Sequence, residues 1–293
     1  MKRLAMILLA ATAILVSACG IDRSGSRGTV PTDPPLPTSP STVDPDGSTT
    51  TAPPGPIGRP APTVQPARTI TVAVWFTRDG NLVFTSRTRR TTTASSRLAM
   101  TELIAGPSLV ETAAGVGTGV PADTSFEITI SSGVATVNLP AVFYAGGEEA
   151  ARLRQAQVVY TLTQFPTVSK VGFHRGGEAL GAPLGRADYA DLLPTILVTS
   201  PLIGQRVSSP ITIAGTANVS EATVSVRILD TAGAEIATTF TTATCGSGCR
   251  GDYSVAITYR VPREQRATVE VYEVSADNGS RIHVVDIPVT LTV

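Results

Sequence analysis

The chain has 293 residues, 42% of them hydrophobic, and its 23 basic and 23 acidic side chains give a net charge of zero. This length suggests about two domains, and the hydrophobic content is enough to fill their cores. A balanced charge argues against a nucleic-acid partner and against a strongly acidic partner.

The first eighteen residues have the pattern of an export signal. Lys2 and Arg3 precede an apolar run over 4–16, which has the length of a signal-peptide core and is too short to span a bilayer. The string Val16-Ser17-Ala18-Cys19-Gly20 then resembles the lipobox of bacterial lipoproteins. A plain signal peptide and a buried apolar helix with a chance cysteine are the alternatives.

The lipobox resemblance implies that residues 1–18 are a lipoprotein signal peptide and that Cys19 is lipidated. In such proteins the cysteine sulfur takes a diacylglycerol, the peptide is cut before it, and the new N-terminus is usually acylated, for example with palmitate. Two or three acyl chains hold a protein to a membrane far more firmly than one. We therefore expect a lipoprotein anchored at the outer face of the cytoplasmic membrane.

Residues 19–68 change character and consist mainly of proline, threonine, serine and glycine. Such a segment buries too little apolar surface to offset the entropy of ordering, so we expect a disordered tether with a polyproline II bias. Its r.m.s. reach would be roughly 35–40 Å as a flexible coil. The tether would hold the folded part away from the membrane, extending into the cell wall. Its Ser/Thr-Pro density leaves O-glycosylation open.

The next segment, 69–192, mixes strand and helix patterns. The expected elements are strands over 69–76 and 82–87 around an Asp79-Gly80-Asn81 turn, a helix from 91–93 to Gly106-Pro107, a hairpin over 125–139, a helix from about Gly147, and a strand over 169–175. This order predicts an α+β domain, a mixed sheet with two helices on one face.

Several strings in this segment resemble a known family, the GerMN or sporulation and spore-germination domain. They are Ala105-Gly106-Pro107 with Glu111, Gly115 and Pro121, the hairpin 133–139, and the run 159–166 with Val168, Val171 and Phe173. The resemblance implies a fold similar to the ring-building modules of secretion systems. The family is not known for catalysis.

The last segment, 195–293, contains strand patterns alone. Seven strands are expected, over 196–199, 211–214, 222–228, 235–241, 252–259, 268–274 and 283–293. Their spacing and alternation predict an all-β antiparallel sandwich. The strings around Ser200-Pro201, Gly215-Thr216-Ala217 and Ile287-Pro288-Val289 resemble the immunoglobulin-like domain of bacterial spore-germination proteins, which commonly follows GerMN.

Two cysteines, Cys245 and Cys249, remain after Cys19. In an oxidising exterior an even pair most simply forms one disulfide, which here would close a small ring within one loop. Free thiols and a metal site are the alternatives, but a metal would need further ligands.

Residues for catalysis are few. The sequence lacks the G-x-S-x-G, H-E-x-x-H and P-loop motifs. His174 and His283 fall in strand patterns, Glu148 and Glu149 suit the first turn of a helix, and Asp277-Asn278-Gly279 suits a turn better than a calcium site. We expect no catalytic residues, no cofactor and no metal.

Two groups of residues are possible interfaces. The first is an arginine cluster, Arg87, Arg89, Arg90 and Arg97, which suits a phosphate-rich wall polymer or an acidic protein face, although a solvated face explains it as well. The second is a stripe on the second helix, Leu153, Ala156 and Tyr160, for which packing inside the domain is the alternative.

The sequence thus predicts a non-enzymatic, lipid-anchored binding or scaffold protein of the bacterial envelope. By its domain resemblances it is of the sporulation and spore-germination type, with an envelope protein or a second copy of itself as partner. A receptor for peptidoglycan or another glycan is the first alternative. A cell-wall enzyme is the second.

Overall fold

The computed structural model describes residues 68–293, which all belong to one compact unit. The predicted signal peptide, Cys19 and the tether up to residue 67 lie outside the described residues. Among the helices that are described, none has the length and apolar character needed to cross a membrane.

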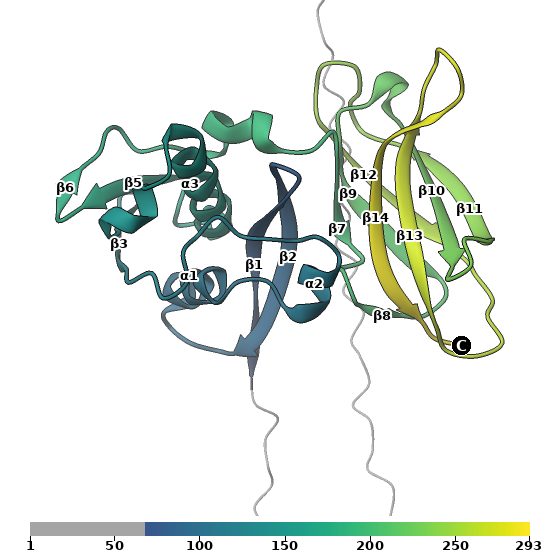
Figure 1. Ribbon diagram of the computed structural model, residues 1–293, viewed down its shortest axis with the longest axis horizontal. Helices are drawn as coiled ribbons and strands as arrows, with labels where there is room; N and C mark the ends of the chain where they lie inside the picture. The colour runs from purple at the N-terminus through teal and green to yellow at the C-terminus, as the bar shows by residue number, and fades with distance from the viewer. Residues whose placement is uncertain (1–67) are drawn as a thin grey trace, which may run out of the picture. The chain divides into compact units, whose positions relative to one another are not determined.

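The first domain opens with a hairpin of two ten-residue strands, β1 (Thr69–Arg78) and β2 (Asn81–Arg90) (Figure 1). The turn residues Asp79 and Gly80 have φ values of 52° and 78°. Positive φ at both central residues gives the backbone twist that a two-residue hairpin requires. The Asp-Gly signal in the sequence therefore marks the turn correctly.

A second sheet of the first domain has the strand order β3-β4-β5-β6. Its strands are β3 (Glu127–Ser131), β4 (Val134–Asn138), β5 (Lys170–Arg175) and β6 (Glu178–Ala179). The β4–β5 pair is parallel and the other two pairs are antiparallel, so the predicted mixed sheet is confirmed. The β1–β2 hairpin is not part of it, because β1 pairs with β2 alone and otherwise bridges only from Thr77 to Gly117.

Two main helices pack on these strands, as the sequence predicts. They are α1 (Ser95–Ala105) and α3 (Glu148–Leu162). A short third helix, α2 (Leu109–Ala113), was not predicted. The helix α3 contacts both β1 and β5, so it does not lie on one face of a single sheet. A 3-10 turn, η1 (Ala141–Tyr144), lies between β4 and α3, and α3 is followed directly by β5.

The first core is formed by side chains of β1, β2, α1, η1, α3 and the mixed sheet. Its largest fully buried members include Phe76, Leu82, Met100, Leu103 and Phe143. Trp75 lies on the opposite side of β1 from Phe76, yet it is also buried, because Phe84 and Tyr160 pack around it at 5.5 and 4.8 Å between ring centroids. Both sides of β1 are therefore covered near its end.

A 3-10 segment η2 (Arg186–Leu192) leads to the second domain, which is all strand. One sheet has the order β12-β9-β7 and the other β11-β10-β13-β14-β8. The strands are β7 (Ile196–Ser200), β8 (Arg206–Val207), β9 (Ile211–Ala217), β10 (Thr223–Asp230), β11 (Glu235–Thr242), β12 (Gly251–Ile257), β13 (Gln265–Val274) and β14 (Arg281–Leu291). The two-sheet, all-β architecture is confirmed.

Strand β7 contributes to both cores. Ile196 and Val198 belong to the core of the second domain, whereas Leu197 between them belongs to the core of the first. Successive side chains of a strand point to opposite faces, so one strand can serve two cores in this way. The carbonyl oxygen of Leu197 also accepts a 3.1 Å hydrogen bond from the hydroxyl of Tyr253.

Candidate functional site

The predicted arginine cluster is largely committed to ion pairs within the first domain. Arg87 donates from Nη1 to Glu111 Oε1 at 2.9 Å and from Nη2 to Glu111 Oε2 at 2.6 Å. Arg89 donates two hydrogen bonds of 2.8 Å to Glu102. Both carboxylates are buried, and the Arg87 side chain is only 15% exposed, so Arg87 mainly neutralises Glu111 inside the domain. Arg89 is paired but remains 47% exposed, and its place in a binding surface stays a prediction.

The other two arginines of the cluster are exposed. Arg97 lies over the ring of Phe126, with its guanidinium carbon 5.3 Å from the centroid. Arg90 stands at the end of β2 and, within residues 68–293, forms no ion pair. With Arg87 and Arg89 paired to carboxylates, the cluster carries less unpaired positive charge for a polyanion than the four arginines in the sequence suggest.

Glu111 has a structural role that its environment makes clear. Ser108 caps α2 and exchanges hydrogen bonds with Glu111 in a capping box, and Thr85 Oγ1 donates to Glu111 Oε1 at 2.5 Å. Burial would raise the pKa of Glu111, but the hydrogen bonds from Arg87, Thr85 and Ser108 together outweigh it and lower the pKa to about 2. A carboxylate that is ionised and fully hydrogen-bonded is suited to stabilising the fold.

The predicted stripe on α3 is not an exposed surface. Ala156 and Tyr160 have exposed fractions of 0% and 3%, and Leu153 is half-buried. The helix is covered because β1, α1, β5 and η2 all contact it. The prediction of a partner interface is wrong for Ala156 and Tyr160, and the alternative of internal packing holds for them.

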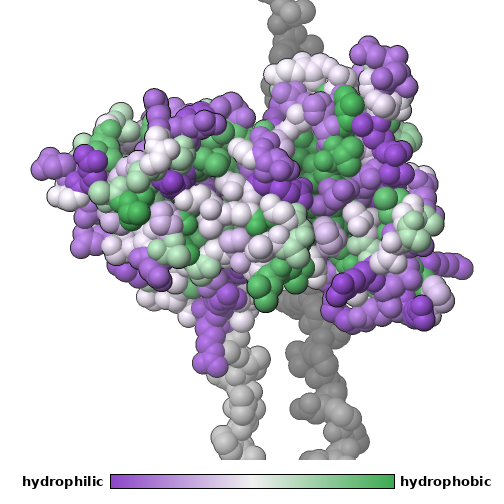
Figure 2. Space-filling model, in the orientation of Figure 1, coloured by the Kyte–Doolittle hydropathy of each residue, from purple (hydrophilic) through white to green (hydrophobic). Residues whose placement is uncertain are grey.

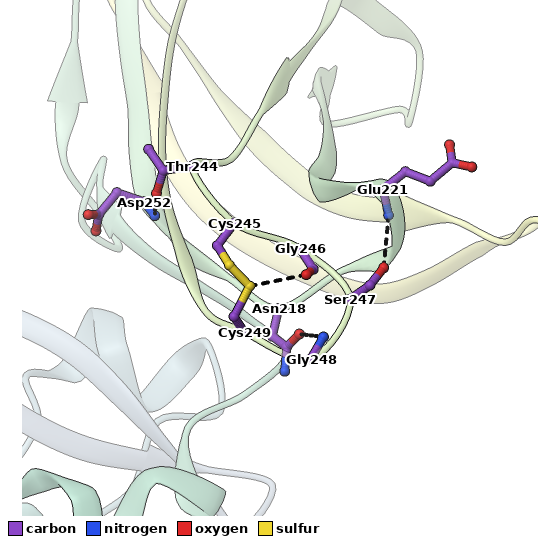
Figure 3. The surroundings of a disulfide bond; sticks show 9 residues. All are labelled: Asn218, Glu221, Thr244, Cys245, Gly246, Ser247, Gly248, Cys249 and Asp252. Carbon is purple, nitrogen blue, oxygen red and sulfur yellow. Dashed lines mark hydrogen bonds between the residues drawn. A yellow bond between two sulfur atoms is a disulfide. The ribbon is translucent and has the colours of Figure 1, made fainter. Parts of the chain in front are cut away.

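The cysteine loop lies between β11 and β12, and there the structure joins Cys245 and Cys249 in a disulfide (Figure 3). Gly248 N–H donates to Asn218 Oδ1 at 3.1 Å, and Glu221 N–H donates to Ser247 Oγ at 3.3 Å. The ring is therefore tied to the chain preceding β10. It lies within one loop and does not join the two sheets.

The remaining residues considered for chemistry lie apart from one another. His174 Nδ1 is 3.0 Å from the carbonyl oxygen of Gly177, and His283 Nε2 is 3.7 Å from Glu273 Oε2. Glu148 and Glu149 begin α3, and Asp277 lies in the turn between β13 and β14. In the part of the chain that the structure describes, no three His, Cys, Asp or Glu side chains are grouped to hold a metal.

A cavity of about 410 Å³ provides the strongest candidate site. It is lined by aromatic, aliphatic and polar side chains together with two arginines: Ala73, Trp75, Phe84, Tyr160, Gln164, Arg186, Leu193, Leu197, Thr199, Thr216 and Arg250. A neighbouring cavity of about 420 Å³ shares Phe84, Leu193 and Leu197 and has a largely aliphatic lining. We refer to the first as the arginine cavity.

The two guanidinium groups of the arginine cavity are held by neutral oxygen atoms. Arg186 donates to Thr163 Oγ1 at 2.8 Å and to the carbonyl oxygen of Tyr160 at 3.2 Å. Its guanidinium carbon lies 5.0 Å from the ring centroid of Tyr160 and 5.8 Å from that of Trp75. Arg250 donates to Thr216 and to the carbonyl oxygen of Pro194.

Sequence reasoning missed this cavity because its residues are far apart along the chain. Arg250 and Pro194, for example, are separated by 56 residues. Neither Arg186 nor Arg250 belongs to a sequence motif. They meet in the folded chain, where β7 contacts β2 and η2 contacts α3.

The comparisons with protein families agree with both domains. Residues 71–181 match the family described as "Sporulation and spore germination", and residues 195–280 match the "Immunoglobulin-like domain of bacterial spore germination". The chain therefore contains a GerMN-type sporulation and germination domain followed by an immunoglobulin-like domain of the bacterial spore-germination type. Among curated proteins, none matches the chain.

Solved structures similar to this chain include GerMN domains. The tandem GerMN domains of the sporulation protein GerM from Bacillus subtilis match at 16% identity and a TM-score of 0.36, covering 77% of this chain and 61% of theirs. The first GerMN domain of that protein matches at 21% identity and a TM-score of 0.31, over 40% of this chain and 95% of its own.

A putative lipoprotein from Clostridium perfringens matches at 18% identity and a TM-score of 0.29. The similar region covers 45% of this chain and 98% of that one. The chain spans about 61% of the length of the tandem GerM structure.

Proposed function

We propose that this GerMN-type chain is a non-enzymatic, lipid-anchored protein of the bacterial cell surface whose two domains bind or scaffold envelope components. The observation that carries the proposal is the order of its parts. The predicted signal peptide over 1–18 and Cys19 precede two successive domains, and both domains match families described by sporulation and spore germination. The anchor would fix the position of the domains outside the cytoplasmic membrane.

The partner that we propose is another envelope protein or a second copy of this chain. Exposed apolar side chains are available on several elements of the described part, among them Leu109 and Val110 of α2 and Phe240 of β11. On the face drawn in Figure 2, hydrophobic residues form small separate patches among hydrophilic ones. Small patches suit a modest contact area for each copy rather than one large obligate interface.

The anchor can be tested by replacing Cys19 in the full-length chain. We expect Cys19→Ala to abolish incorporation of labelled palmitate and to release the protein from the membrane fraction, while its circular dichroism remains that of a folded protein. Cys245→Ser is the matched control and should keep the lipid. Unchanged palmitate labelling and membrane retention in Cys19→Ala would refute the anchor.

The scaffold role can be tested by crosslinking in cells from Leu109 and Phe240, followed by mass spectrometry of the products. Recovery of a self-crosslink or of one envelope protein supports the role. A protein that crosslinks to nothing from either position, while remaining anchored, would contradict it.

A glycan receptor is the second candidate function, and the aromatic lining of the arginine cavity favours it. Trp75, Phe84 and Tyr160 contribute rings, and Gln164 contributes an amide. Sugar rings commonly pack on aromatic side chains because both have apolar faces. Sedimentation of the full-length protein with purified cell-wall sacculi tests this function. Binding should be weaker for Tyr160→Ala than for Arg263→Ala, at an exposed arginine outside both the arginine cluster and the cavity, and no sedimentation would rule the function out.

A further inference from the structure

We propose that the arginine cavity binds one oxyanion, a carboxylate or a phosphate group, carried by a small ligand. This inference goes beyond the proposed function, because it concerns a ligand site and does not depend on lipid anchoring. The residues that would contact the anion are Arg186, Arg250 and Trp75.

The first observation is that the guanidinium groups of the cavity have no carboxylate partner in the described part of the chain. Within residues 68–293, neither Arg186 nor Arg250 forms an ion pair, and both donate only to hydroxyl and carbonyl oxygens. Nη1 of Arg186 and Nε of Arg250 make none of these hydrogen bonds. A guanidinium group with free N–H donors is the group that most readily binds a planar carboxylate or a phosphate.

The guanidinium groups of Arg186 and Arg250 are partly shielded from water. Arg186 as a whole is exposed and Arg250 is half-buried, but burial of their guanidinium ends lowers the pKa of each. Burial also raises the pKa of Tyr160, and the charges of Arg186 and Arg250 act against that rise. Charges that are partly desolvated and face one cavity gain more from an anion than charges in bulk water.

Asp191, a carboxylate whose charge acts on Tyr160, is already paired with another arginine. Both of its oxygens accept hydrogen bonds from Arg152, at 2.6 and 2.8 Å. It is also an exposed side chain, so solvent screens its charge. Asp191 therefore does not neutralise the two arginines of the cavity.

An unpaired buried donor is the second, independent observation. Trp75 has an exposed fraction of 4%, and its Nε1 is the buried side-chain nitrogen or oxygen without a hydrogen-bond partner among the described residues. A buried N–H without a partner costs free energy, and native structures rarely leave one. Trp75 is one of the residues that line the cavity, and a bound acceptor that reached its Nε1 would supply the missing partner.

The size and the walls of the cavity indicate what carries the anion. A volume of about 410 Å³ falls within the range of small-molecule sites. The rings of Trp75, Phe84 and Tyr160 form an apolar wall beside the two guanidinium groups. This combination suits a ligand with one oxyanion and an apolar or sugar-like body.

The chain contains a single tryptophan, Trp75, and this makes a direct test possible. The probes are sodium acetate, sodium phosphate and sodium chloride, added to the full-length protein at constant ionic strength. Acetate or phosphate should change the fluorescence of Trp75 saturably, and chloride should not. Which of the two anions binds more tightly would distinguish a carboxylate ligand from a phosphate ligand.

Variants distinguish binding of the anion in the cavity from a general effect of salt on the protein. Arg186→Gln and Arg250→Gln should each weaken binding about 10-fold or more, because each removes a charged donor. Arg186→Lys should retain part of the affinity, and Arg90→Gln, at an exposed arginine outside the cavity, should bind as the wild type does. Thermal melting of each variant establishes that it is folded.

A second measurement that does not use fluorescence is needed, because the fluorescence of Trp75 could change for a reason other than binding. Isothermal titration of Trp75→Phe should show weaker binding of the same anion, since the ring is kept and the N–H is lost. The proposal is overturned if neither acetate nor phosphate binds the wild type. It is equally overturned if folded Arg186→Gln and Arg250→Gln both bind with wild-type affinity.

Discussion

Arg87 and Glu111 form a two-point ion pair in the first domain, with N–O distances of 2.9 and 2.6 Å and side chains that are 15% and 5% exposed. The pair ties the start of α2 to β2, which are otherwise separated by the whole of α1. Glu111 is also the acidic residue of the GerMN-like string around Gly106-Pro107. Its hydrogen bonds give it a place in the fold.

Replacing Glu111 should destabilise the protein strongly. Glu111→Gln leaves the Arg87 guanidinium without its counter-charge in a mostly buried place, and breaking a buried ion pair in this way costs about 3–5 kcal/mol. Urea unfolding of the full-length protein measures the change. Glu264→Gln is the matched control, because its pair with Arg206 is exposed and should contribute no more than about 1 kcal/mol. Equal losses in the two variants would contradict this prediction.

The contribution of Glu111 should depend on pH below about 5. Its pKa is 4.5 when unperturbed and about 2 in the folded protein, so the folded state favours the ionised form. The stabilisation is complete above pH 4.5 and is lost as the pH falls toward 2. A shift of this size corresponds to about 3 kcal/mol.

The pH prediction is checked by the difference in unfolding free energy between the wild type and Glu111→Gln. That difference should be constant from pH 5 to 7 and should shrink as the pH is lowered from 4.5 to 2. A difference that does not change over this interval would show that Glu111 does not titrate as described.

Gly215 should not tolerate a side chain. An ideal Cβ at this position of β9 would lie 1.9 Å from the carbonyl oxygen of Leu197, which is backbone and cannot move aside cheaply. Overpacking of this kind costs about 1–3 kcal/mol or more, so Gly215→Ala should lower the melting temperature clearly. Gly117→Ala is the control, since the nearest atom to its Cβ would be 4.0 Å away. A Gly215→Ala protein as stable as Gly117→Ala would disprove the close approach.

Removing the disulfide should have a limited effect. The double change Cys245→Ser and Cys249→Ser opens a ring of four-residue separation, for which chain entropy gives about 2 kcal/mol. Because the ring lies in one loop, amide hydrogen exchange should increase around Ser247 and Gly248 and remain low in β9 and β13. Loss of protection throughout the second domain would mean that the bond holds the two sheets.

Strands of the second domain were readily predicted because alternation repeats along nearly every one of them. The hairpin over β3 and β4 was also predictable, since Ser132 and Gly133 form its turn with positive φ values. The helix α2 was not, because its five residues are too few to show a periodic pattern. Its Ser108-x-x-Glu111 capping signal was present in the sequence.

The candidate site was beyond prediction for a different reason. The sequence contains four arginines near one another. Two of them have carboxylate partners that they meet only in the folded domain: Glu102 is 13 residues from Arg89, and Glu111 is 24 residues from Arg87. Conversely, Arg186 and Arg250 are isolated in sequence and share a cavity in space. Local sequence patterns indicate where turns lie and which face of a helix or strand is buried. They do not indicate which charges are neutralised, because ion pairs depend on long-range packing.

Strand β7 limits how far the two domains can be treated as interchangeable parts. Its side chains alternate between two cores, with Leu197 in one and Ile196 and Val198 in the other. A chimaera joined between the two domains would therefore have to bring a residue of matching size at position 197, or the first core would contain a void. Recombination of such domains is constrained by side chains on the far side of the joint, Leu197 and Ile203 among them.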